Sequence, residues 1–414
     1  MGNSRPSKLP ESFNLDSSPQ RDANLTPISD TVMTGQTSSY LVERNNAKLL
    51  IAVFTDRIAV IGVNSKKRGT HPLQPGVLIT ASALCNYPTE PFLLVATSTH
   101  SLLKFELHLL FSQDSQEDLE TFRFVEPVQY PINAPVTLMD FYDAQMLVVR
   151  HDDKGYSRIW FNETYDHYVV KEYYSSDEQI TAIISNPKTG MFVIAAKNHL
   201  IFLSNGVKND MPNPMKTALS LAIYPQLFLL FLLAHDPDSE PYIQIWDLRT
   251  RALLCEKHLK SEHILTQMLL KPCIQMAGVI AVLLFSESSF MFVLEYSPVP
   301  VHLSPAFMLQ LDRVCGNLVR SYLTEGSCYL ISDSLYSLAQ EDFMPLQKTA
   351  LWTIPVLASS SDLDLRTRVV DLRDNMDRRQ VRELGLGLSE AVNRMIRQRP
   401  SSAARSRADT NATG

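Results

Sequence analysis

The chain has 414 residues, of which 45% are hydrophobic, and a formal net charge of -6. This length allows one large core or two to three domains of ordinary size. The acidic balance argues against a general nucleic-acid binder, because such proteins need surplus Lys and Arg to displace the counterions of phosphates. We therefore expect no nucleic-acid partner.

The N-terminal segment, residues 1–38, is rich in Ser, Pro, Asn and Asp and shows little periodic hydrophobicity. Such a composition buries too little apolar surface to offset the entropy lost on ordering. We predict a disordered arm here. The segment also lacks the apolar stretch of a secretory signal, so we expect a cytoplasmic protein.

A hairpin-like unit recurs along the middle of the chain. Each copy has a short strand rich in aliphatic and β-branched residues, a polar turn and a second strand with alternation. The seven copies span residues 49–63, 92–107, 145–161, 191–204, 227–247, 279–296 and 327–338.

Their turns lie about 40 to 50 residues apart, the spacing typical of propeller blades. Weaker strand candidates such as "TLMDF" and "ITAIIS" stand between the hairpins. The alternative is two stacked β-sandwich domains, whose strands would recur without such a period. We predict an all-β fold, a WD40-like seven-bladed β-propeller over residues 39–350, with the first hairpin beside the last.

The stretch "PYIQIWDLRTRALL", residues 241–254, contains a Trp-Asp pair. We predict that Trp246 and Asp247 end the third strand of the fifth blade and that the ring of Trp246 packs against the neighbouring blade. The remaining repeats lack this pair, and a Gly-His pair is missing throughout.

The most apolar run, Leu227 to Ala234, has eight residues between Pro225 and a charged turn. A membrane-spanning helix needs about 20 apolar residues. We therefore predict a buried strand and no transmembrane segment.

The C-terminal region, residues 351–414, changes to helical periodicity. Apolar residues from Val381 to Ile396 recur at steps of three and four, which places them on one face of a helix. The surrounding cations include Arg378, Arg379, Arg382, Arg394 and Arg397. Such a basic helical tail can lie on an anionic membrane or in a partner's groove, or pack on the propeller itself.

No catalytic, cofactor-binding or metal site is predicted. The five cysteines form no C-x-x-C pair and have no His at the spacing of metal ligands, which indicates reduced thiols. The turns "RHDDKG" and "AHDPDSE" combine His with acids, but hairpin turns are normally solvated. We therefore expect no enzyme.

A second basic group, "KKRG", follows the first hairpin. Lys66, Lys67 and Arg68 could bind a phosphate or an acidic peptide, or form a solvated loop. With the C-terminal arginines, these residues are the candidate contacts for partners or anionic lipid.

Residues 90–275 resemble the PROPPINs, a family of β-propellers that bind phosphoinositides. The likeness lies in the order of the pieces in residues 137–204 and 219–270, where a long acidic turn precedes "PYIQIWD" and a basic outer strand. The resemblance implies a propeller in a membrane-trafficking or autophagy setting. The family's Phe-Arg-Arg-Gly motif is missing, because residues 279–304 contain no arginine.

The sequence therefore predicts a non-catalytic propeller scaffold that binds protein partners and can contact an anionic membrane peripherally. The alternative is a PROPPIN-like phosphoinositide reader.

Overall fold

The computed structural model describes residues 12–344 of the chain. Residues outside this description within that range are 24, 30–35, 45–46, 86–90, 115, 117–119, 133–134, 143–145, 152–154, 162–167, 176–177, 187–189, 205–206, 214, 216, 236–239, 274–278, 289, 299–300, 312–319, 324–326 and 332–334. Nearly all described residues belong to one compact unit. The predicted helical tail, residues 351–414, lies outside the described residues.

The described strands form seven separate sheets, which we number 1 to 7 along the chain. Sheet 1 contains β4 (Gln36–Arg44), β5 (Ala47–Phe54), β6 (Arg57–Gly62) and β7 (Arg68–Pro72); sheet 2 contains β8 (Ile79–Cys85), β9 (Phe92–Thr97), β10 (Ser101–Glu106) and β11 (Val128–Pro131). Sheet 3 contains β12 (Val136–Tyr142), β13 (Met146–His151), β14 (Gly155–Phe161) and β15 (Tyr168–Ser175); sheet 4 contains β16 (Ile180–Ser185), β17 (Phe192–Ala196), β18 (His199–Ser204) and β19 (Val207–Pro212).

The other three sheets include N-terminal strands. Sheet 5 contains β20 (Thr217–Tyr224), β21 (Leu229–His235), β22 (Pro241–Asp247), β23 (Ala252–Lys260) and β1 (Ser12–Asn14); sheet 6 contains β24 (Leu265–Pro272), β25 (Ile280–Ser286), β26 (Phe290–Pro298), β27 (Val301–Gln310) and β2 (Gln20–Asp22). Sheet 7 contains β28 (Arg320–Leu323), β29 (Ser327–Ile331), β30 (Leu335–Ala339) and β3 (Leu25–Ser29). The helical elements are η1 (Leu15–Ser17), α1 (His108–Asp114) and α2 (Gln340–Phe343).

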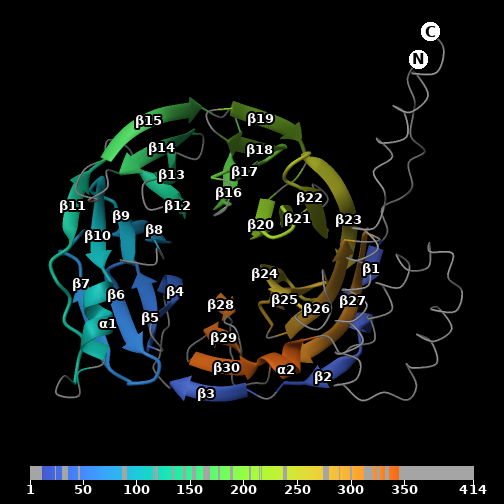
Figure 1. The fold of residues 1–414 in the computed structure, drawn as a ribbon, viewed down its shortest axis with the longest axis horizontal. Coiled ribbons are helices and arrows are strands. Elements are labelled where there is room, and N and C mark those ends of the chain that lie inside the picture. Colours follow the sequence, from blue (N-terminus) through green and yellow to red (C-terminus); the bar gives the residue numbers. More distant parts are fainter. Residues whose placement is uncertain are drawn as a thin grey trace, which may run out of the picture. The chain divides into compact units, whose positions relative to one another are not determined.

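The sheets stand side by side around a centre, with β4, β8, β12, β16, β20, β24 and β28 innermost (Figure 1). The predicted all-β propeller arrangement is confirmed. Each of the seven hairpins read from the sequence forms the second and third strands of one sheet. These strands are buried on both faces, as in β9 and β25, because each sheet is covered by a neighbour on either side.

Polar side chains join neighbouring inner strands. The hydroxyls of Ser38 on β4 and Ser82 on β8 lie 2.6 Å apart. On β24, Gln267 accepts bonds from the Ser321 N–H and hydroxyl of β28, both at 3.0 Å. Similar bonds link Asp140 to Ser185, Thr181 to Ala218 and Ser220 to Met268. Side-chain hydrogen bonds thus connect the inner strands of neighbouring sheets.

Sheets 1 and 7 pack against each other, as predicted for the first and last hairpins. Their shared core includes Leu50 and Phe54 from sheet 1 and Tyr329 and Ile331 from sheet 7. The Lys48 amine also donates to the Tyr329 hydroxyl at 3.2 Å. The chain therefore meets itself, and the ring has no exposed flank between its first and last sheets.

The prediction of a disordered arm over residues 1–38 is wrong for residues 12–23, 25–29 and 36–38, whereas residues 1–11, 24 and 30–35 lie outside the described residues. β3 is the outermost strand of sheet 7 and pairs antiparallel with β30. β1 and β2 add parallel strands to the outer edges of sheets 5 and 6. The composition is polar because these strands lie on the outside of the ring, where hydrogen bonds to the neighbouring strand order them. A propeller fragment that begins near residue 40 would lack the fourth strand of sheet 7.

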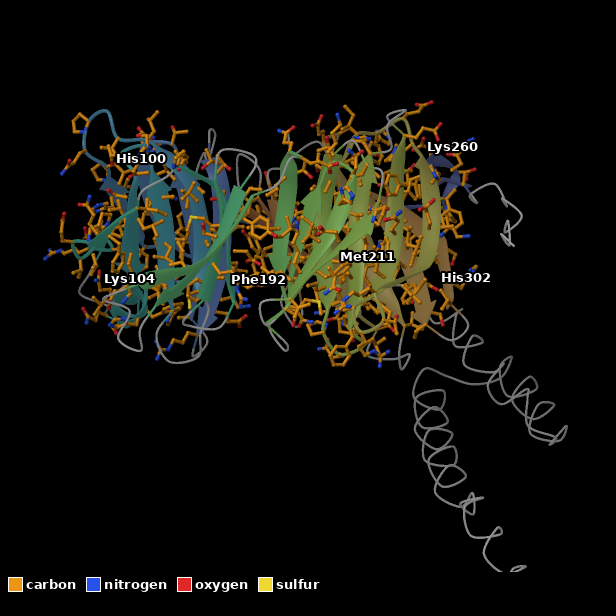
Figure 2. The ribbon with its side chains drawn as sticks, turned by 90° about the horizontal axis from the view of Figure 1, so that it is seen from above. His100, Lys104, Phe192, Met211, Lys260 and His302 are labelled. Carbon is orange, nitrogen blue, oxygen red and sulfur yellow. The ribbon has the colours of Figure 1, made fainter. Side chains whose placement is uncertain are left out.

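The strand order defines two faces of the ring. The upper face carries the turns between second and third strands and the connections between sheets; the lower face carries the other turns. His100, in the turn between β9 and β10, and Lys260, at the end of β23, both lie at the upper edge in Figure 2.

We expect the carboxyl group of Asp140, on the inner strand β12, to make the stability of the fold depend on pH. Burial raises its pKa, and hydrogen bonds from Ser185 and Phe141 only partly offset this effect. A folded-state pKa above the unfolded one stabilises the fold below the unfolded pKa, and this contribution is lost as the pH rises through the folded pKa.

We predict that Asp140→Asn raises the free energy of unfolding at pH 7, because the amide keeps an acceptor oxygen for Ser185 without a desolvated charge. The difference from the parent should shrink as the pH falls toward ordinary carboxyl pKa values. Urea unfolding at several pH values measures both effects, with the exposed Asp22→Asn as control. An equal loss of stability at every pH would contradict this account.

Candidate interaction surfaces

The predicted basic loop lies in the turn between β6 and β7, on the lower face. Lys66 is exposed and adopts a left-handed backbone conformation with φ of 59°. Arg68 is also exposed, at the start of the outer strand β7. Lys67 between them is only partly exposed, and its side chain turns back toward the protein.

The Lys67 amine closes the carboxyl end of helix α1. It donates to the carbonyls of Gln113 at 2.8 Å and Asp114 at 3.0 Å, and also to the carbonyl of Gln116. The last carbonyls of a helix have no partner within the helix, and a cation complements the negative end of its dipole. Lys67 therefore has a structural role that the sequence pattern did not reveal.

The segment after α1 lies along β7. The Phe122 N–H donates to the Arg68 carbonyl at 2.9 Å, and Thr121 bridges Arg68 in parallel. A Cβ atom at Gly69 would lie 2.6 Å from the Cβ and 2.7 Å from the carbonyl oxygen of Phe122. Only glycine permits this close approach.

This arrangement adds a cation that the sequence analysis missed. The Gln113 side chain accepts from the backbone N–H of Arg123 at 2.7 Å and donates to the backbone carbonyl of Arg123 at 2.9 Å. Arg123 is exposed, as are Lys66 and Arg68. We call these three residues the lower basic surface. The other predicted contacts, Arg378, Arg379, Arg382, Arg394 and Arg397, lie outside the described residues.

Trp246 is in the third strand of sheet 5, as predicted, and only 4% of its surface is exposed. Its ring lies 6.3 Å from that of Phe202 in sheet 4, which confirms the predicted contact with the neighbouring sheet. The indole N–H donates to the Gln244 side-chain oxygen at 3.0 Å. The polar edge of the ring is therefore satisfied within the sheet.

Asp247 shapes the turn that follows. Its carboxylate accepts from the backbone N–H of Arg249 at 2.8 Å and of Thr250 at 3.4 Å, and from the Arg249 side chain at 3.2 Å. Burial alone would raise the pKa of Asp247, but the bonds from Arg249 and Thr250 outweigh it and lower the pKa. The Trp-Asp pair thus joins a packing anchor to a turn.

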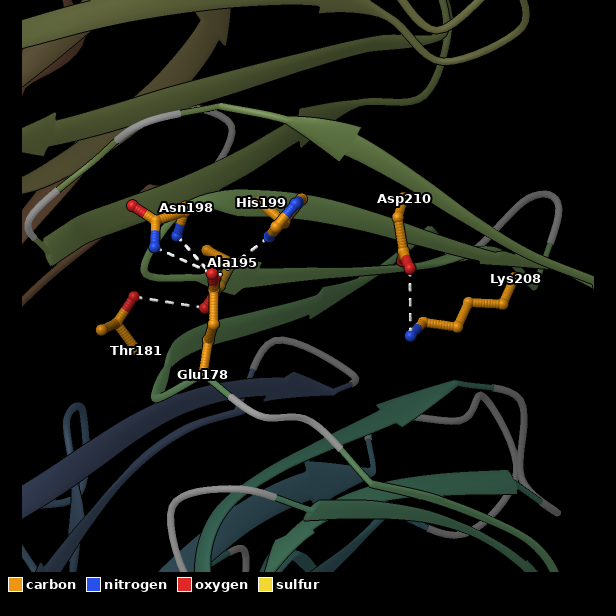
Figure 3. A network of polar contacts seen from close by, with 7 residues as sticks. All are labelled: Glu178, Thr181, Ala195, Asn198, His199, Lys208 and Asp210. Atoms are coloured by element: carbon orange, nitrogen blue, oxygen red, sulfur yellow. Dashed lines mark hydrogen bonds and ion pairs between the residues drawn. The ribbon is translucent and has the colours of Figure 1, made fainter.

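A carboxylate and a histidine meet on the upper face (Figure 3). Glu178, before β16, accepts from Asn198 N–H and Nδ2 at 2.8 Å and lies 3.1 Å from His199 Nδ1. Burial would raise the pKa of Glu178, but these bonds lower it overall. The carboxylate is used to hold the turn between β17 and β18, so we assign this group a structural role.

The described part of the chain contains neither a metal-binding cluster nor a membrane-spanning helix. No group of three or more His, Cys, Asp or Glu side chains there is arranged to hold a metal ion. No helix there is long and apolar enough to span a membrane. The His-acid turns considered from the sequence lie mainly in residues 152–154 and 236–239, outside the description.

Comparisons with known proteins agree with this architecture. No protein-family model and no curated protein matches the chain. Among solved structures, a chain of the mitotic checkpoint complex matches with a TM-score of 0.57 and 10% identity, over 82% of this chain and 98% of that chain. The fold is a β-propeller. At this identity the likeness shows the fold alone, and nothing in these comparisons supports the PROPPIN resemblance.

We predict that Trp246→Ala lowers the free energy of unfolding by about 3 to 5 kcal/mol, the usual range for a buried aromatic residue. The cavity would open between sheets 4 and 5. Trp246→Phe keeps a ring beside Phe202 and should lose much less. Equal midpoints of urea unfolding for the parent and Trp246→Ala would contradict the packing role.

We predict that Lys67→Met destabilises the fold by about 1 to 3 kcal/mol, because it leaves the carbonyls at the end of α1 without their charged donor. Lys66→Met, one residue away and exposed, should change stability by less than about 0.5 kcal/mol. Hydrogen exchange should rise in residues 108–114 of the Lys67 variant alone. Equal behaviour of the two variants would argue against the helix-closing role.

Proposed function

We propose that the chain is a non-catalytic scaffold that binds an acidic segment of a protein partner at the lower basic surface. One observation carries this proposal: the lower basic surface is exposed on backbone that neighbouring residues hold in place. Lys67 and Gln113 do so by hydrogen bonds, and Gly69 does so by its close approach to Phe122. Backbone that is already ordered loses little further entropy on binding, and guanidinium groups pair well with carboxylates.

The fold supports the same role. A propeller presents side chains on a rigid ring, and the described polar clusters are used to hold turns and helix ends. We further propose that each of the seven sheets is one blade of the propeller. The setting in membrane-trafficking or autophagy assemblies extends this proposal and rests on the PROPPIN resemblance alone.

The alternative, a phosphoinositide reader, lacks an arginine pair in the segment that the resemblance indicates. Residues 290–304 contain no arginine. Within them, β26 ends at Pro298 and β27 begins at Val301, and most of β26 is buried. Peripheral contact with an anionic membrane is assigned in this proposal to the C-terminal arginines.

The test is affinity capture of the tagged full chain from native cells, followed by mass spectrometry. We expect the triple variant Lys66→Glu, Arg68→Glu, Arg123→Glu to lose at least one partner that the parent captures reproducibly, because reversed charge repels an acidic segment. Lys197→Glu, on the upper face, is the matched control and should keep that partner. Identical partners for parent and triple variant would overturn the proposal.

Liposome flotation separates the lipid alternative from the scaffold. The full chain should bind phosphatidylserine and phosphoinositide vesicles of matched charge equally and release them in high salt. Replacing the five C-terminal arginines by Gln should abolish this binding. Selective, salt-resistant binding to phosphoinositide vesicles would favour the reader instead.

A further inference from the structure

The N-terminal segment of residues 12–22, which we call the belt, lies on the outer side of sheets 5 and 6. We call the surface that it covers, on strands β23 and β27, the seat. β1 pairs in parallel with His258–Lys260 of β23, and β2 with Met308–Gln310 of β27. The short helix η1 crosses from one sheet to the other between these strands. Figure 1 shows β1 and β2 outside β23 and β27.

Side chains of three chemical kinds anchor the belt. Leu15 is fully buried in a core that includes Leu259 and Leu303. The Lys257 amine lies 5.2 Å from the centre of the Phe13 ring. Asp16 accepts from the Ser261 hydroxyl at 3.0 Å and from the N–H of Glu262 at 2.8 Å. The contacts on this surface therefore match the sequence pattern aromatic-x-Leu-acid.

The seat does not depend on the belt for its shape. Sheets 5 and 6 are joined at their inner strands, where the Met268 N–H donates to Ser220 at 3.2 Å, and by a shared core that contains Phe231 and Leu284. The belt itself contributes two strands of three residues. Little pairing would be lost if it left, and the two walls would remain.

The apolar surface continues beyond the belt. Among the described residues, no strand pairs with the outer edges of the first parts of β23 and β27, where Leu253, Leu254 and Val301 are 43%, 36% and 44% exposed. A segment longer than the belt could pair along the same edges and cover these side chains. Main-chain bonds to an exposed edge with side-chain anchors are a common way to bind peptides.

We propose that the surface between β23 and β27 is a binding site for an extended segment of a partner protein with the pattern aromatic-x-Leu-acid, and that the belt occupies it in cis until the partner displaces it. This site deepens the proposed scaffold function by naming a second surface. Its test uses a peptide, so its failure leaves the capture result at the lower basic surface unaffected.

The probe is a fluorescent peptide of residues 10–23, added to the full chain. The belt-releasing variants Leu15→Asp and Asp16→Lys should bind it at least tenfold more tightly than the parent, because the competing cis segment is weakened. A peptide with Leu15→Asp should not bind any of them. Anisotropy gives the affinities, and a cooperative thermal transition checks that each variant is folded.

A second measurement uses the parent chain, so the test does not depend on a variant that folds. Excess heavy-isotope peptide should increase hydrogen exchange in the chain's own residues 12–16 while residues 258–260 of β23 stay protected. Absence of peptide binding by both folded variants, with unchanged exchange in the parent, would overturn the proposal. If the Leu15→Asp and Asp16→Lys variants have the mass of a dimer in solution, a second copy of the chain is the occupant, and this outcome would also overturn the proposal.

Discussion

The need of every sheet for a neighbour on both faces governs this structure. Strands such as β17 and β25 are buried along their whole length, so a sheet exposed on one side would place a continuous apolar surface in water. A ring of sheets removes that exposure. The side-chain bonds between inner strands, of which Ser38 to Ser82 and Gln267 to Ser321 are examples, then fix the sheets at close distance around the centre.

Closure places the N-terminus on the outside of the ring. Sheet 7 draws its fourth strand, β3, from the beginning of the chain and the other three from the end of the described region. Separating the two would require breaking the whole ladder between β3 and β30. Residues 12–22 are consequently held against sheets 5 and 6, where Leu15 is buried. A segment that looks unstructured by composition thus becomes part of the ring.

The sequence predicted the centre of each sheet well and its edges poorly. Second and third strands are apolar runs interrupted by polar turns, a signal that survives without any fixed motif, and all seven hairpins were located by it. β1 and β2 have three residues each and take their order from β23 and β27, so no local pattern in "SFN" or "QRD" could reveal them. Trp246 was placed correctly because its alternation with Ile245 and Ile243 was visible. The role of Lys67 was hidden because its partners are backbone carbonyls 46 or more residues away in the chain.

Some charged side chains stabilise the ring, whereas others remain available to contact a partner. Charged hydrogen bonds stabilise turns and a helix end in this structure, through Glu178, Asp247 and Lys67. Because the chain has only fourteen glycines, these side chains take over much of the turn-forming role that glycine has in other proteins. A turn fixed by side chains has fewer alternative conformations than one made by glycine. Neighbouring side chains that are not used in this way, such as Arg68 and Arg123, are then presented at constant positions. The residues that stabilise the ring therefore also determine which surfaces are rigid enough to select a partner.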